Sequence, residues 1–231
     1  MHRIPEPELM KSHQQVKAYA EADFSSSDFA MLISLEEYIL SVSKVINEKS
    51  LIIDLGCGPG NITERIACRW PLSRVIGIDG SEEMLSVAKA RKSKFESLRN
   101  LKGLSYLQED LASLSANKPI FKENPDVITS NSVLHHVHDP NIFWGCIKNL
   151  SKVGTVIFQK DLRRPPSIEE AIRLQEKYQP NSPSILKRDF LASLRAAFTL
   201  DEVQAQLEFA GLYQLKVFEV DDRYLEIIGV L

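Results

Sequence analysis

The first 50 residues carry the hydrophobic pattern of a helix. Apolar side chains recur there at steps of three and four residues, which is the spacing of one face of an amphipathic helix. They are Leu32, Leu35, Ile39, Val42 and Ile46. Asp28 precedes this stripe and is expected to cap the start of the helix. We therefore predict a helical N-terminal cap over residues 1–50.

From Leu51 the pattern changes to short apolar runs separated by helical stretches. The runs predict strands at Leu51–Leu55, Arg74–Ile78, Leu104–Leu107, Val127–Ser130 and Val153–Gln159. Helices are expected between them, among them Asn61–Arg69 and one that Ser81 caps and that ends at about Leu98. Repeated units of this kind predict a parallel sheet with helices on both faces and right-handed crossovers.

The remainder of the chain departs from this alternation. Residues 161–198 hold four prolines and are interpreted as a helical insertion. Thr199 and Glu202 have the spacing of a capping box for a helix that Gly211 ends.

Two final apolar segments, Leu212–Val220 and Arg223–Val230, predict an antiparallel hairpin. The expected fold class is α/β, with seven strands, mostly parallel, in a domain over residues 51–231.

Composition is that of a globular protein. The 231 residues are 44% hydrophobic and 26% charged, which excludes a wholly disordered chain. No apolar run approaches the roughly 18 residues that span a bilayer, so we expect no membrane segment. The charges and prolines of residues 3–8 are unlike a secretory signal. A cytoplasmic protein is expected.

The net charge and the cysteine content indicate which kinds of partner and of structural cross-link to expect. The net charge of −3 argues against broad capture of nucleic acid, although a local basic patch stays open. Cys57, Cys68 and Cys146 are odd in number and widely spaced, so neither a zinc site nor a disulfide framework is expected.

A glycine-rich loop follows the first predicted strand. It reads Asp54-Leu55-Gly56-Cys57-Gly58-Pro59-Gly60-Asn61. Glycines allow a sharp turn and the close approach of a ligand, but such loops open several kinds of nucleotide site. Asn61 stands where a dinucleotide-binding loop has its last glycine, which disfavours a nicotinamide dehydrogenase.

Carboxylates end the next two predicted strands. Asp79 can accept hydrogen bonds from both hydroxyls of a ribose, and it opposes phosphate. Asp110 can accept from an exocyclic amine such as that of adenine. Strand ends of this kind meet at the carboxyl edge of the sheet, where α/β proteins bind ligands. The pattern suits a phosphate-free, zwitterionic sulfonium nucleoside.

Four segments in order resemble the successive motifs of class I S-adenosylmethionine-dependent methyltransferases. They are Leu51–Gly60, Val75–Asp79, Glu109–Leu111 and Asp126–His136. The match spans about residues 45–160 and is nearest to the broad UbiE-like, or methyltransferase-domain, type of small-molecule enzyme. The resemblance implies a Rossmann-like fold, S-adenosylmethionine as cofactor, and direct in-line transfer of its methyl group to a small molecule.

The resemblance also implies a set of cofactor-binding residues. Gly56, Cys57 and Gly58 would lie beside the methionine part and ribose, Asp79 would bind ribose, Gly80 and Met84 would flank adenine, Asp110 and Leu111 would hold its edge, and Asn131 would adjoin the methionine part. Asp54 and Asn61 complete the loop. Tyr19 would fold over the cofactor, with ordinary helix packing as the alternative.

Residues 131–140 hold three of the five histidines. His135 or His136 is a candidate catalytic base, with packing or cofactor contact as the alternative. Because neighbouring side chains diverge on most backbones, a metal site is not expected there.

The segment after the fifth predicted strand supplies candidates for the acceptor side. Residues 160–195 hold eight Lys or Arg and five Asp or Glu, an excess of three positive charges that suits an anionic acceptor. A solvated helical surface is the alternative. Asp161 is a catalytic candidate, and Arg163, Arg164 and Tyr178 are candidates for binding the substrate.

Two other functions use the same cofactor. The chain could methylate tRNA or protein, against which its acidic balance counts, or it could bind the cofactor without catalysis.

Overall fold

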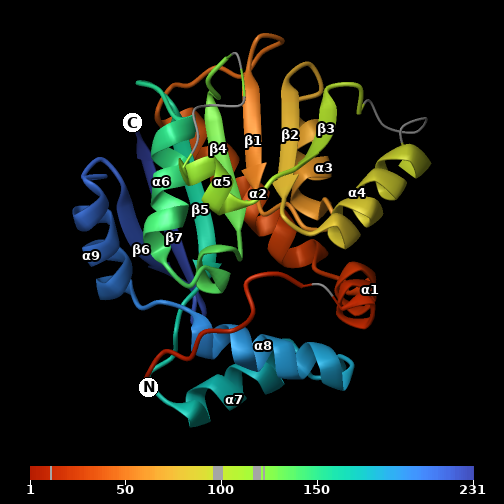
Figure 1. Ribbon diagram of the computed structural model, residues 1–231, viewed down its shortest axis with the longest axis vertical. Helices are drawn as coiled ribbons and strands as arrows, with labels where there is room; N and C mark the ends of the chain where they lie inside the picture. Colours follow the sequence, from red (N-terminus) through yellow and green to blue (C-terminus); the bar gives the residue numbers. More distant parts are fainter. Residues whose placement is uncertain (11, 96–100, 117–120, 122) are drawn as a thin grey trace.

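The computed structural model describes residues 1–10, 12–95, 101–116, 121 and 123–231. They form one seven-stranded sheet in the order β3-β2-β1-β4-β5-β7-β6. Its strands are β1 (Leu51–Leu55), β2 (Arg74–Asp79), β3 (Leu104–Gln108), β4 (Val127–Asn131), β5 (Val156–Leu162), β6 (Lys216–Val220) and β7 (Tyr224–Val230). β1 to β5 pair in parallel, and β7 lies antiparallel to both β5 and β6. The predicted Rossmann-like α/β fold with a terminal hairpin is confirmed (Figure 1).

Two helices precede the first strand, and the others lie in the connections between the strands. The helices are α1 (His13–Glu21), α2 (Ser25–Ser41), α3 (Asn61–Arg69), α4 (Glu82–Phe95), α5 (Leu111–Ala116), α6 (Pro140–Leu150), α7 (Ile168–Tyr178), α8 (Ser184–Ala196), α9 (Leu200–Ala210) and the short 3-10 helix η1 (Leu134–His136). Neighbouring residues of β1 belong to different hydrophobic clusters. Ile53 shares a cluster with residues of α6 and α9, whereas Ile52 shares one with residues of α2 and α3. Both faces of the sheet are therefore covered, as its apolar strands require.

The predicted fifth strand differs from the structure at its two boundaries, and one further predicted boundary is not tested. The predicted strand Val153–Gln159 is wrong at both ends, because Val153 is 93% exposed beside a turn at Gly154, where φ is +87°. β5 instead begins at Val156 and continues to Leu162. Asp161 and Leu162, predicted as the start of the helical insertion, are therefore the last two residues of this strand. Leu98, the predicted end of the helix after Ser81, lies outside the described residues.

The N-terminal helical stripe is also divided differently. α2 begins at Ser25, so Asp28 lies within its first turn and does not cap it. The Asp28 carboxylate accepts a hydrogen bond from Arg65 at 3.4 Å. α2 ends at Ser41, and Val42 and Ile46 pack against the same cluster from beyond the helix.

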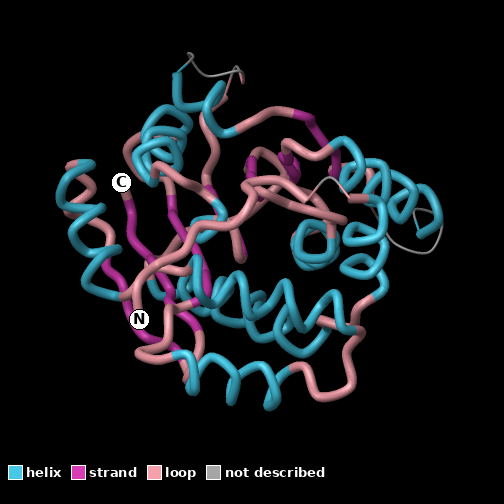
Figure 2. The backbone as a smooth tube through the Cα atoms, turned by 60° about the horizontal axis from the view of Figure 1, so that its bottom comes forward, coloured by secondary structure: helices cyan, strands magenta, loops and turns pink. Residues whose placement is uncertain are grey.

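The N-terminal segment, α7 and α8 cross the end of the sheet at which β1 to β5 finish. In Figure 1 both helices lie below the sheet, and the N-terminal segment runs between the helices and the sheet. Figure 2, which brings this end forward, shows helix and loop segments in front of the strands. Arg3 fastens the segment, because its guanidinium donates to the carbonyls of Ala196 at 2.6 Å, His135 at 3.1 Å and Val137 at 3.0 Å. The N-terminus thus joins α8 to the loop after β4.

No helix among the described residues is both long and apolar enough to cross a membrane.

The capping box of α9 provides a test of local stability. Glu202 N–H donates to the Thr199 hydroxyl at 3.3 Å, and Thr199 N–H donates to the Glu202 carboxylate at 2.9 Å. We expect Thr199→Ala to lower the free energy of unfolding by about 1 kcal/mol, because a helix-terminal N–H loses its acceptor. Urea unfolding measures this. Thr199→Ser should retain wild-type stability, and an equally stable alanine variant would contradict the assignment.

Candidate functional site

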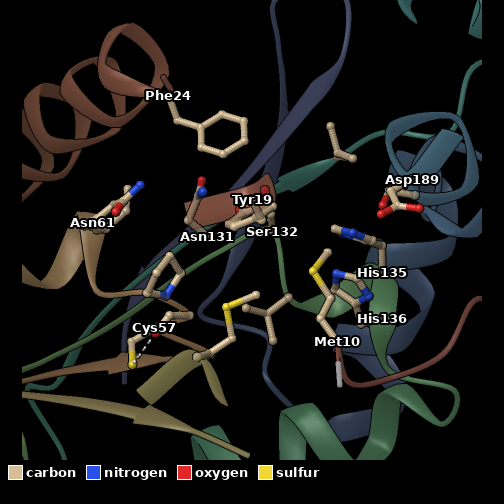
Figure 3. Close-up of a pocket in the computed structure, with 18 of the residues that line it drawn as sticks. Met10, Tyr19, Phe24, Cys57, Asn61, Asn131, Ser132, His135, His136 and Asp189 are labelled. Carbon is tan, nitrogen blue, oxygen red and sulfur yellow. Dashed lines mark hydrogen bonds between the residues drawn. The ribbon is translucent and has the colours of Figure 1, made fainter. Parts of the chain in front are cut away.

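The carboxyl edge of the sheet opens into a cavity of about 1060 Å³. The ends of β1, β2, β4 and β5 line it, together with the start of β7, the N-terminal segment and α8. In Figure 3, Asn61 and Cys57 lie on one side of this cavity and His135 and His136 on the other, with Asn131 between them.

The glycine loop adopts a backbone conformation that residues other than glycine rarely adopt. Gly56 and Gly58 have φ of +65° and +53°, a region that favours glycine. A Cβ added to Gly58 would meet nothing within 4 Å, although the residue lines the cavity. The loop therefore presents bare backbone to open space in which a ligand can lie.

Asp79 is tied directly to this loop. Its carboxylate accepts from the Gly58 N–H at 2.8 Å and, through the other oxygen, from the Ser81 N–H at 2.8 Å. Burial raises the pKa of Asp79, and these two N–H groups oppose the shift. Each oxygen keeps a further lone pair, so the carboxylate can still accept from a bound hydroxyl.

Asp54 lies deeper in the same cavity. Its side chain is 1% exposed and accepts a hydrogen bond from the Thr63 hydroxyl at 2.6 Å. Burial raises the pKa of Asp54 to about 7, and the Thr63 hydrogen bond opposes this shift. A cationic ligand group beside it would favour the ionised carboxylate.

The structure brings all of the predicted cofactor residues to this one cavity. The lining includes Tyr19, Asp54, Gly56, Cys57, Gly58, Asn61, Asp79, Gly80, Met84, Asp110, Leu111 and Asn131. Asp110 also accepts from the Ser113 N–H at 2.6 Å at the start of α5. Tyr19 packs on Phe24 with ring centroids 4.8 Å apart, so it serves helix packing while lining the cavity.

His135 and Asp161 form a buried pair on the opposite side. His135 Nδ1 lies 2.5 Å from Asp161 Oδ1, and the other carboxylate oxygen accepts from the N–H groups of Val133 and Leu134, each at 2.7 Å. Burial alone raises the pKa of Asp161, but His135 and these N–H groups lower it overall. Burial likewise opposes the charged form of His135, yet Asp161 and Glu6 raise its pKa overall. The ionised carboxylate therefore holds the hydrogen on Nδ1 and leaves Nε2 as the basic atom.

Glu6 completes this cluster. Its Oε1 lies 3.5 Å from His135 Nε2 and 3.3 Å from His136 Nδ1, and it accepts from the Ser193 hydroxyl at 2.8 Å. Burial is the main cause that raises the pKa of Glu6, whereas burial and His135 lower that of His136 to about 3.

The expectation that the two histidines diverge is wrong. Their ring centroids are 4.2 Å apart, although the two residues are neighbours in η1. Each histidine and Glu6 offers a ligand atom within 4.8 Å of the others, so the geometric argument against a metal there does not hold. No sequence signal marked Glu6, which lies 129 residues before His135 in the chain.

The structure does not bring Arg163 and Arg164 to the cavity. Arg163 pairs with Glu219 at 2.7 Å, and Arg164 pairs with Glu202 at 2.6 Å. Both arginines fasten the end of β5 to neighbouring elements. Tyr178 does line the cavity, and its hydroxyl donates to Asp222 at 2.6 Å.

Other lining residues were missed by the sequence analysis. They lie on β5, on α8 and at or just before the start of β7: Lys160, Asp189, Arg223 and Tyr224. Lys160 stood next to the predicted strand, but nothing in the local sequence marked Arg223, because hairpin pairing alone returns it to this edge.

Comparison with known proteins identifies the domain. Residues 46–211 match the family described as "Methyltransferase domain". The chain belongs to this family. The methyltransferase domain thus covers β1 to α9 and includes the glycine loop, Asp79 and the histidine pair.

Relatives and solved structures agree with this assignment. A trans-aconitate 2-methyltransferase of Methylobacterium nodulans is 30% identical over 163 residues, which cover 69% of this chain and 56% of the relative. One from an Azoarcus species is 33% identical over 94 residues, covering 41% and 32%. The chain thus spans about half, or less, of these relatives.

Two crystal structures share the fold. A SAM-dependent methyltransferase from Aquifex aeolicus has a TM-score of 0.63 at 18% identity, covering 94% of this chain and 98% of the other. The plantazolicin methyltransferase BpumL, in complex with a pentazolic desmethylPZN analog and SAH, has a TM-score of 0.68 at 18% identity, covering 94% and 90%.

Asp54 makes the stability of the methyltransferase domain depend on pH. Its pKa of about 7 in the folded protein exceeds the ordinary value of 3.8, so its contribution is fully present below about pH 4 and is lost as pH rises to about 7. We expect Asp54→Asn to gain stability relative to wild type over this window, by on the order of 4 kcal/mol at most. Urea unfolding at pH 5 and pH 8 measures it. A constant difference between the two proteins would refute the shift.

Proposed function

We propose that this methyltransferase domain binds S-adenosylmethionine along the glycine loop and transfers its methyl group to a small molecule under α7 and α8. The observation that carries the proposal is the Asp79 carboxylate, held against the Gly58 N–H at the open cavity. In this position the carboxylate keeps lone pairs that can accept hydrogen bonds from a ribose. Its negative charge would repel a phosphate group.

Charge along the cavity supports this cofactor. Asp54, Asp79 and Asp110 line the half formed by β1 to β3, and no described lysine or arginine does. A pyrophosphate would be repelled there, whereas the cationic ammonium and sulfonium groups of S-adenosylmethionine would be attracted. The residues present therefore fit this cofactor.

Each part of the cofactor has residues that can hold it. We assign the ribose to Asp79, the adenine to Gly80, Met84, Asp110 and Leu111, and the methionine part to Asp54, Gly56, Cys57, Gly58 and Asn131. Asn61 would close the glycine loop and Tyr19 would cover the cofactor from the N-terminal segment.

The chemistry requires little more than alignment. Bound S-adenosylmethionine supplies a methyl group that its sulfonium already activates. The protein holds the acceptor in line with that group and excludes water, and such positioning can lower a barrier by roughly 7–11 kcal/mol. The N-terminal segment, pinned by Arg3, and α8 supply the cover over the cavity.

His135 and Asp161 can accept a proton from the acceptor. Asp161 fixes the ring and favours its protonated form, so Nε2 can take the proton of a hydroxyl or an amine. His136 lies in the same wall and keeps its ring neutral, which suits shaping of the pocket. We therefore assign the base to His135.

The relatives support a small acceptor. Two carry the name trans-aconitate 2-methyltransferase, and BpumL was solved with a desmethylPZN analog. The three cysteines are free, as in the reducing cytoplasm where we place the protein.

The function is tested by supplying methyl-labelled S-adenosylmethionine with separated small-molecule, tRNA and protein fractions of a cell extract. Label should enter the small-molecule fraction, and mass spectrometry identifies the product. Label in tRNA or protein would overturn the small acceptor. Cofactor binding with no labelled product in any fraction would favour a non-catalytic protein.

The ribose assignment predicts the effect of Asp79→Asn. We expect affinity for S-adenosylhomocysteine to fall by about 1–3 kcal/mol, because charge-assisted hydrogen bonds are lost. Isothermal titration calorimetry measures the affinity, and circular dichroism verifies folding. The control is Asp201→Asn, on the exposed side of α9. Unchanged affinity in Asp79→Asn would remove the central support of the proposal.

The proton-acceptor assignment predicts the effect of His135→Gln. With an acceptor that loses a proton, kcat should fall by roughly 10²–10⁴-fold while affinity for S-adenosylhomocysteine is retained. In the wild type, kcat/KM should decline as pH falls through the raised pKa of His135, above 6.5, because the ring is then protonated. His13→Gln, in the exposed first turn of α1, should leave both unchanged. Full activity in His135→Gln would exclude this role.

A further inference from the structure

Basic residues are scarce in the cavity and lie at one end of it. Among the described lining residues, the lysines and arginines are Lys160, near the end of β5, and Arg223, just before β7. In the sheet order, β5 and β7 follow β4 on the side away from β1 and β2. The basic residues of the cavity therefore lie at the end farther from the glycine loop, where Asp189 and Asp221 also line it.

Lys160 is already balanced by the protein. Its Nζ lies 3.6 Å from Glu226 Oε1 and 4.9 Å above the Tyr224 ring, and its side chain is only 5% exposed. The pairing residue comes from β7, directly opposite Lys160 in the strand register. Lys160 thus brings no unpaired charge to a ligand.

Arg223 is different. Its guanidinium stacks on Tyr178, 3.4 Å from the ring centroid, and on Tyr224 at 4.6 Å. Its Nε is buried without a hydrogen-bond partner, and its side chain forms no ion pair within the described part of the chain. A buried donor left unsatisfied costs free energy that a ligand acceptor could recover.

The two neighbouring carboxylates do not satisfy this cation. Asp221 uses its carboxylate to accept from the backbone N–H of Arg223 at 2.8 Å. Asp222 accepts from Lys177 and from Tyr178, each at 2.6 Å. Two aromatic rings lie against the guanidinium, and its N–H groups form a planar fork that a partner can meet at the edge.

We propose that Arg223 binds a carboxylate of the methyl acceptor. A carboxylate matches this planar fork in a bidentate pair, and aromatic stacking fixes the plane of the fork beforehand. The site lies two strands beyond Asn131 along the sheet edge, so the bound carboxylate anchors one end of the acceptor. The cavity of about 1060 Å³ reaches the upper end of the roughly 300–1000 Å³ usual for one ligand, which leaves room for cofactor and acceptor together.

This inference rests on the proposed function, and its experiment separates the two. The protein is saturated with S-adenosylhomocysteine and titrated in a calorimeter with aliphatic and aromatic mono-, di- and tricarboxylates, trans-aconitate among them. The uncharged methyl ester of each acid and inorganic phosphate are titrated in parallel. We expect at least one acid to bind and its ester to bind at least about tenfold more weakly.

Three variants locate the effect. Arg223→Gln should weaken the bound acid by roughly 10–100-fold, and Arg223→Lys should recover part of the loss because it keeps the charge without the fork. Arg195→Gln is the matched control, since this α8 arginine does not line the cavity. S-adenosylhomocysteine should bind all three variants as it binds the wild type, which also shows that they are folded.

Several outcomes would overturn the inference. They are equal binding of acid and ester, tighter Arg223-dependent binding of phosphate, undiminished acid binding in Arg223→Gln, or binding of S-adenosylhomocysteine without any acid. If S-adenosylhomocysteine itself does not bind the wild type, the proposed function fails first.

Discussion

The hydrogen bond from the Gly58 N–H to Asp79 joins the loop after β1 to the end of β2. It fixes a loop that glycine conformations alone would leave free, and it places a carboxylate where the bare backbone faces open space. Parallel pairing of β1 with β2 is what brings the two ends together. The half of the cavity around the glycine loop therefore depends on one backbone-to-carboxylate contact supported by the sheet.

A second buried carboxylate organises the other half. Asp161 accepts from the backbone N–H groups of Val133, Leu134 and Leu162 and also holds His135. These bonds tie β5 to η1 and set the direction in which the imidazole presents its basic nitrogen. The N-terminal segment reaches the same point through Glu6, so the wall of the pocket combines a residue near the start of the sequence with residues from its middle.

Basic residues line the cavity at one end of the sheet edge only, among the described residues. Carboxylates at the ends of β1 and β2 suit a cationic cofactor, whereas Arg223, just before β7, suits an anionic partner. The uncharged Asn131 at the end of β4 lies between them. An arrangement of this kind can orient two oppositely charged ligands toward each other within one cavity.

The sequence by itself determined the local elements and the residues that line the cavity around the glycine loop. The strand Leu51–Leu55, the glycine loop and the Thr199 capping box depend on residues close together in the chain, so periodicity and spacing reveal them. Tertiary structure alone decided that Arg163 pairs with Glu219 outside the cavity while Arg223 enters it. Strand pairing and helix packing determine which of several residues with the same charge enters the cavity. These contacts join residues far apart in the chain, so no local sequence pattern predicts them.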